Sequence, residues 1–88
     1  MSRAFVNEDA AGPERIYTLP DRDDPGFDEA AAMTLIEGWN QGDTHGAERA
    51  TGYSWGEPTL RPYVEKLLAD AEARGNDRIA QLARRFLR

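Results

Sequence analysis

The chain has 88 residues, 40% of them apolar, and its 16 acidic and 11 basic side chains give a formal net charge of -5. This length limits it to one domain, and the lack of cysteine excludes a disulfide framework, a thiolate zinc site and a thiol nucleophile. No apolar run approaches the roughly 18 residues of a membrane span, and the first residues lack the apolar stretch of a secretory signal, so we expect a small cytoplasmic protein without a membrane partner.

Residues 1–24 are predicted to form an irregular or disordered arm. They are rich in proline and aspartate, and their apolar residues form two short islands, one around Phe5 and Val6 and one around Tyr17. Neither island is long enough for a helix, and a lone short strand would need a partner edge. Two interpretations stay open. The arm is a loosely packed tail, or it is a linear segment whose Phe5, Val6 and Tyr17 dock on this domain or on a partner.

Residues 25–88 are predicted to form a single small helical domain. Asp23-Asp24-Pro25 offers an acidic N-cap with proline at the first helical position, and Gly42 ends the helix. The apolar face of this first helix repeats at four-residue steps through Phe27, Ala31, Leu35 and Trp39.

The second predicted helix is short and weakly amphipathic. Asp43 or Thr44 caps it, and it ends near Gly52. Its narrow apolar face consists of Ala47, Ala50 and Tyr53. In the connector that follows, we expect Trp55 to fold back on the core.

A third and a fourth helix complete the pattern. Thr59 caps the third, which leaves Pro62 in the first turn, where a missing N–H has no intrahelical partner. Its buried stripe is Leu60, Val64, Leu67, Leu68 and Ala71. Gly75 follows this helix, and Asn76 or Asp77 caps the fourth. The apolar side of the fourth helix is Ile79, Leu82, Ala83, Phe86 and Leu87.

A shift of the sequence by 33 residues aligns two helix-turn-helix segments, as in helical-hairpin repeats. The predicted fold is therefore all-α, with two antiparallel helical hairpins of three to four helices in all, preceded by the irregular arm. Amphipathic helices in so short a chain can also complete their core by dimerising, so a homodimer stays an open alternative.

No residue set predicts catalysis, a metal site or a cofactor. The run from Asp21 to Gly26 follows the D-x-D-x-x-G opening of a calcium loop, but the twelfth position, which needs a bidentate glutamate, is Ala32. Phosphate-cradling, nucleophile-elbow and H-E-x-x-H motifs are absent from the sequence. We expect a protein that is not an enzyme. The open alternative is a small enzyme or ligand carrier with a pocket around Trp39, Tyr53 and Trp55.

The charges are unevenly divided along the chain. Residues 1–43 carry ten acids and three arginines, a balance of -7, whereas the other 45 residues carry six acids and eight bases, a balance of +2. The final eleven residues concentrate the positive charge in Arg78, Arg84, Arg85 and Arg88. These arginines form either a solvated face that compensates the helix dipole or a binding face for an acidic partner, which includes the acidic N-terminal arm of this chain itself. Nucleic acid is the less expected partner, because the acidic chain repels it.

The opening Met1–Asp9, with the letters MSRAFVNED, resembles the leader of bacterial transcription elongation factors of the Gre type. Their leader commonly has lysine where this chain has Asn7. The resemblance implies a bacterial protein and an association with RNA polymerase. The body of the chain departs from this family and resembles no family that we recognise. The coiled-coil hairpin and β-rich domain of a Gre-type factor do not fit in it, so the cleavage activity is not carried over.

The function we expect is a protein-binding or adaptor module whose protein partner contacts the Phe5/Val6 arm, the C-terminal arginines or the groove between hairpins. The alternative is a transcription-linked regulator that contacts RNA polymerase or nucleic acid through Arg78, Arg84, Arg85, Arg88 and the leader.

Overall fold

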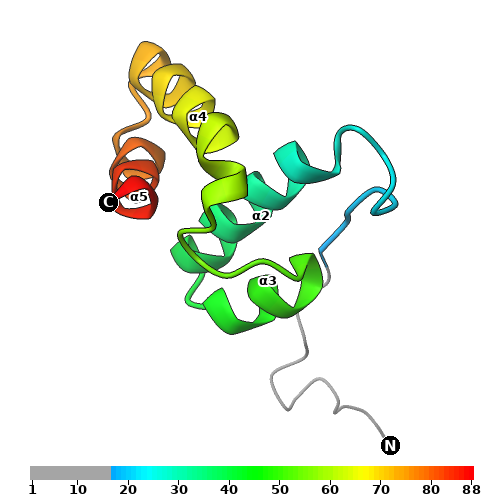
Figure 1. The fold of residues 1–88 in the computed structure, drawn as a ribbon. Coiled ribbons are helices and arrows are strands. Elements are labelled where there is room, and N and C mark those ends of the chain that lie inside the picture. The colour runs from blue at the N-terminus through cyan, green and yellow to red at the C-terminus, as the bar shows by residue number, and fades with distance from the viewer. Residues whose placement is uncertain (1–16) are drawn as a thin grey trace, which may run out of the picture.

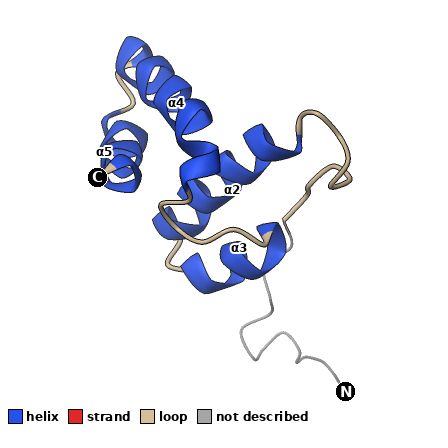
Figure 2. Ribbon diagram, in the orientation of Figure 1, coloured by secondary structure: helices blue, strands red, loops and turns tan. Residues whose placement is uncertain are grey.

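A computed structural model describes residues 17–88, and this part of the chain is all-helical, with no strand (Figure 2). In order, its α-helices are α2 (Phe27–Asn40), α3 (Thr44–Thr51), α4 (Arg61–Arg74) and α5 (Asp77–Leu87), and the short 3-10 helix η2 (Pro58–Leu60) precedes α4. Helix α3 packs on α2, and α4 packs on α5 (Figure 1). The predicted all-α fold of helical hairpins is confirmed. Phe5 and Val6 lie outside the described residues.

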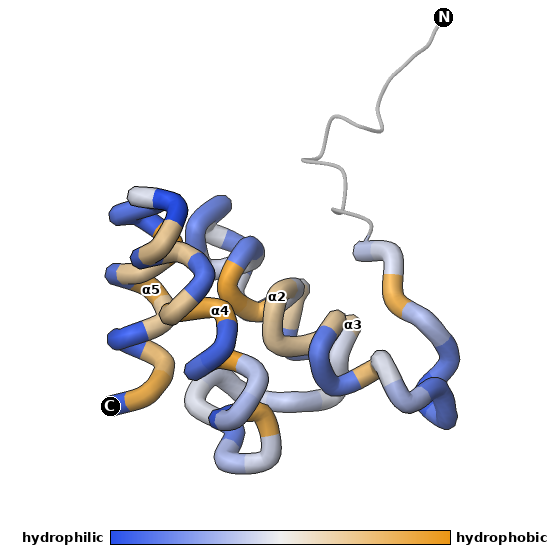
Figure 3. The backbone as a smooth tube through the Cα atoms, turned by 90° about the horizontal axis from the view of Figure 1, so that it is seen from above, coloured by the Kyte–Doolittle hydropathy of each residue, from blue (hydrophilic) through white to orange (hydrophobic). Residues whose placement is uncertain are grey.

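Helix α2 connects the two hairpins, because it packs on α3 as well as on η2, α4 and α5. Its inward face consists of small and branched side chains with no solvent exposure, namely Ala31, Ala32, Leu35 and Ile36. The other helices cover this face with Ala47, Leu60, Val64, Leu82, Ala83 and Phe86. In Figure 3 the backbone tube of each helix alternates between hydrophobic and hydrophilic residues along its length.

The start of α2 differs from the prediction, because a turn precedes the helix. The Asp24 backbone N–H donates to the Asp21 carbonyl (2.9 Å), and the Asp24 carboxylate accepts the Gly26 N–H (2.7 Å). The regular helix begins only at Phe27, so Pro25 lies in the turn and is not the first helical residue. The predicted acidic N-cap is wrong, because the N-cap is Gly26, no side chain caps the helix, and the Asp24 carboxylate is used in the preceding turn.

Helix α3 buries a different residue from the one predicted. Ala50 is exposed, whereas the neighbouring Thr51 is fully buried. The Thr51 hydroxyl donates to the Ala47 carbonyl (2.9 Å), which removes the cost of burying a polar group. The predicted ends of α3 are confirmed, with Asp43 before it and Gly52, at φ 78°, after it.

A close contact between α2 and α3 depends on Gly38. A Cβ atom at this position would lie 2.5 Å from the Ala47 Cβ and 3.1 Å from the Asp43 carbonyl oxygen. Only a residue without a side chain lets the two helices approach this closely. The sequence pattern did not indicate this role, because Gly38 lies within a continuous helix.

The burial of α2 predicts that substitutions at two of its residues change the free energy of unfolding by different amounts. Leu35→Ala should lower the free energy of unfolding by about 2–5 kcal/mol, because it leaves a cavity at a fully buried site. Met33, on the same helix, is 37% exposed, so Met33→Ala should cost less than about 1 kcal/mol. Urea unfolding followed by circular dichroism measures both. Equal losses would contradict the observed orientation of α2.

A second prediction concerns the contact between α2 and α3. Gly38→Ala should destabilise the protein by about 1–3 kcal/mol, because overpacking outweighs the roughly 1 kcal/mol by which alanine favours a helix interior. Glu37→Ala, at the adjacent exposed position, is the control and should change stability by no more than about 0.5 kcal/mol. A more stable Gly38→Ala variant would show that the two helices do not approach this closely. Thermal unfolding of both variants decides the point.

Candidate functional site

The two tryptophans of the chain meet at the surface where α2, the 52–57 connection and α5 converge. The Trp39 and Trp55 rings stack with centroids 4.4 Å apart, and Trp55 also contacts the edge of the Phe86 ring at 4.9 Å. Phe86 is buried, whereas both tryptophans are half-buried. The pair therefore covers the core and at the same time presents aromatic surface to solvent.

Local backbone geometry brings Trp55 to this position. Gly52 ends α3 in the left-handed conformation, and Gly56 adopts φ 88° just after Trp55, so the connection turns back toward α2. The Glu48 carboxylate accepts the Trp55 N–H at 2.8 Å, which holds the connection against α3. The prediction that Trp55 folds back on the core is confirmed.

Two arginines of α5 lie beside the tryptophans. The Arg85 Cζ atom is 6.0 Å from the centroid of the Trp39 ring, within the range of a cation–π contact. Arg78 donates from Nε to the Asn40 side-chain oxygen (2.8 Å) and from Nη1 to the Gln81 side-chain oxygen (3.2 Å). Neither arginine pairs with a carboxylate of the described residues. We call Trp39, Trp55, Arg78 and Arg85 the tryptophan–arginine face.

The four C-terminal arginines do not form one surface. Arg84 Nη2 contacts the Glu72 carboxylate of α4 at 2.7 Å, on the other side of α5 from the tryptophans. Residues 84 and 85 are adjacent, and successive helical residues point about 100° apart, so one faces α4 and the other faces α2. Arg88 is exposed beyond the last turn of α5. The C-terminal carbonyl of α5 has a partner on α4 instead, because Arg61 donates to the Leu87 carbonyl oxygen at 3.0 Å.

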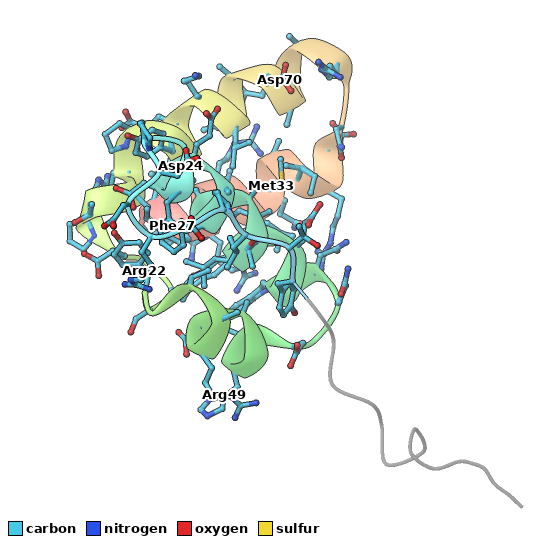
Figure 4. The ribbon with its side chains drawn as sticks, turned by 90° about the vertical axis from the view of Figure 1, so that its right-hand side faces the viewer. Arg22, Asp24, Phe27, Met33, Arg49 and Asp70 are labelled. Carbon is cyan, nitrogen blue, oxygen red and sulfur yellow. The ribbon has the colours of Figure 1, made fainter. Side chains whose placement is uncertain are left out.

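Tyr17 docks on its own chain. Its hydroxyl donates to the Asp43 carboxylate at 2.7 Å. Arg22 fixes the same segment, because its Nη1 donates to the Thr51 carbonyl (3.0 Å) and its guanidinium lies 5.1 Å from the centroid of the Phe27 ring (Figure 4). Within the described part of the predicted arm, residues 17–22 therefore pack on the helices.

The three aromatic residues proposed to line a pocket are divided between two clusters. Tyr53 packs its ring on Phe27 at 6.4 Å and donates from its hydroxyl to the Asp28 carboxylate at 2.7 Å. Trp39 and Trp55 stack on each other near the opposite end of α2. The sequence could not show this division, because Tyr53 and Trp55 are only two residues apart.

The hydrogen bond to Asp28 raises the pKa of Tyr53 above its usual value of 10.0, with desolvation and the charge of Asp28 adding to the effect. The positive charge of Arg22 opposes this shift. The contacts of Tyr53 with Asp28 and Phe27 join the start of α2 to the connection after α3, so they stabilise the fold.

Within residues 17–88, no cluster of three or more histidine, aspartate or glutamate side chains could hold a metal ion. No helix in the same range has the length and apolarity needed to cross a membrane. Comparisons with protein-family models, curated proteins and solved structures gave no match to this chain. The tryptophan–arginine face is therefore interpreted from its own chemistry.

The raised pKa of Tyr53 has a measurable consequence. The folded state favours the protonated Tyr53 phenol. Its hydrogen bond to Asp28 therefore stabilises the folded protein fully below pH 10, and this contribution is lost as the pH rises through the raised pKa of Tyr53 in the folded state. Ultraviolet difference titration should show a late phenolate step that Tyr53→Phe removes. Asp28→Asn should move this step toward the ordinary tyrosine value. A late step that persists in Tyr53→Phe would assign it to another residue.

Proposed function

We propose that this chain is a small bacterial protein-binding or adaptor module and that its protein partner binds to the tryptophan–arginine face. The observation that carries the proposal is a stacked, half-buried tryptophan pair beside two arginines that have no carboxylate partner in the described chain. Tryptophan and arginine are the residue types that contribute most to binding energy at protein interfaces.

The face is also held in place before any partner arrives. Trp55 fixes Trp39 by stacking, and Glu48 fixes the backbone of Trp55. Asn40 and Gln81 hold the guanidinium of Arg78. Side chains that are already ordered lose little conformational entropy on binding, so more of the contact energy remains as affinity.

The alternative function is a transcription-linked regulator that contacts RNA polymerase or nucleic acid. It is supported by the resemblance of the leader, which lies outside the described residues, and by the presence of arginine next to aromatic rings, which also stack bases. The net charge of -5 and the Glu48 carboxylate beside Trp55 oppose a polyanion at this face. These charges favour the protein-binding function.

Site-specific photo-crosslinking in the native cell tests the proposal. Gln81 is exposed on α5 and bonded to Arg78, so a photoreactive residue there should capture a specific protein. The same residue at Arg49, exposed on α3, is the control and should not capture that protein (Figure 4). The purified partner should then bind the purified chain at about one to one.

Two results would count against the proposal. One is equal capture from both positions, which indicates contact without specificity. The other is the absence of any protein captured at Gln81 while the control for incorporation succeeds. Capture of RNA polymerase subunits or nucleic acid at Gln81 would support the alternative function.

A further inference from the structure

We infer that the tryptophan–arginine face recognises a short acidic peptide segment that carries an apolar side chain among its carboxylates. This inference rests on the function proposed above and specifies the chemistry of the partner at the same face. Three observations lead to it: the distribution of ion pairs, the spacing of the two arginines, and the nature of the surface beside them.

The distribution of ion pairs separates this face from the rest of the α4–α5 hairpin. Three other cations have carboxylate partners, in the pairs Lys66–Glu29, Arg74–Asp70 and Arg84–Glu72. Arg61 donates instead to the Leu87 carbonyl, and Arg88 is exposed beyond the last turn of α5. Arg78 bonds only neutral oxygens, and Arg85 lies over a ring. Within Asp77–Leu87, the two arginines without a carboxylate partner, Arg78 and Arg85, both lie on the side of α5 that faces Trp39. Carboxylates of a partner would form charge-assisted hydrogen bonds there.

The spacing of the arginines suits an extended peptide. Residues 78 and 85 are seven apart on one helix, which corresponds to about 10.5 Å along the axis. In an extended chain, successive residues are about 3.3 Å apart and their side chains alternate between two faces. Carboxylates four residues apart therefore face the same way and are about 13 Å apart, and long arginine side chains can cover the difference. Carboxylates separated by that spacing can reach Arg78 and Arg85 together, which leaves the residues between them near Trp39.

The surface beside the arginines is aromatic, so a ligand with carboxylates alone would leave its exposed apolar area in contact with water. The exposed parts of Trp39 and Trp55 gain free energy when they are covered by an apolar side chain. A nucleic acid would bring continuous phosphate charge toward Glu48, whereas a peptide can place its carboxylates only opposite the arginines. The acidic turn Asp21–Gly26 of a second copy fits less well, because its only apolar side chain is Pro25.

The two tryptophans provide the measurement, because both lie at the face and the chain has no others. The probe is a short glutamate-rich peptide with one central leucine, titrated while the intrinsic fluorescence is recorded. We expect a saturable change. Replacing the central leucine by alanine should weaken binding roughly tenfold, as expected for losing one buried aliphatic side chain. Replacing the glutamates by glutamine should abolish binding, and added salt should weaken it.

Matched variants locate the effect on the protein. Arg78→Gln with Arg85→Gln should weaken peptide binding by roughly tenfold or more, since two charge-assisted contacts are lost. Arg49→Gln with Arg84→Gln removes the same net charge away from the face and should change the affinity by less than about threefold. Circular dichroism checks that both double variants remain folded.

Several outcomes would overturn the inference: no response to the acidic peptide, an equal loss in both double variants, or tighter binding of single-stranded oligothymidylate than of the peptide. The inference and the proposed function fail separately. If crosslinking at Gln81 captures a protein whose binding survives Arg78→Gln with Arg85→Gln, the face is an interface but its partner is not acidic. If nothing is captured at Gln81 and no peptide binds, both fail.

Discussion

The burial of one face of α2 is the constraint on which the rest of the described structure depends. Helix α3 packs on α2 alone among the helices, and the α4–α5 hairpin also joins it through α2. Its alanines at positions 31 and 32 allow close approach, while Leu35 and Ile36 fill the centre of the core. The same helix carries Trp39 in its last turn, so the orientation that buries the core also fixes one side of the binding face.

The sequence predicted several features that depend on neighbouring residues, but the predicted Thr59 cap is wrong, because a 3-10 helix capped by Glu57 precedes α4. Gly52 and Gly75 end their helices with positive φ, and Asn76 accepts the Ile79 N–H, because caps and left-handed termini are local properties. The start of α2 was predicted wrongly because the Asp24 carboxylate accepts the Gly26 N–H within the Asp21–Gly26 turn. It is therefore not the cap of the helix, which begins at Phe27. In a helix as short as α3, periodicity alone could not show that Thr51 is buried and Ala50 is exposed.

The candidate site was only partly predictable, since it depends on contacts between distant residues. Arg78 and Arg85 were named because they concentrate positive charge, but their separation from Arg84 required the position of α4. Trp55 was expected on the core, yet its stacking on Trp39 depends on how the 52–57 connection crosses α2. Whether an arginine has a carboxylate partner depends on which helices pack together, so the order of acidic and basic residues along the chain cannot show it.

The hairpin organisation also has a consequence for how the chain folds. Each hairpin joins helices that are adjacent in sequence, so much of the packing closes short loops and carries a small entropic cost. The Trp39–Trp55 contact and the ring of Phe86 instead join segments from both hairpins. Contacts between segments far apart in the sequence carry a larger loop-closure cost, so we expect them to form after the hairpins and to act mainly on the unfolding rate. A ligand that bridges Trp39 and α5 would therefore prolong the lifetime of the native state without accelerating its formation.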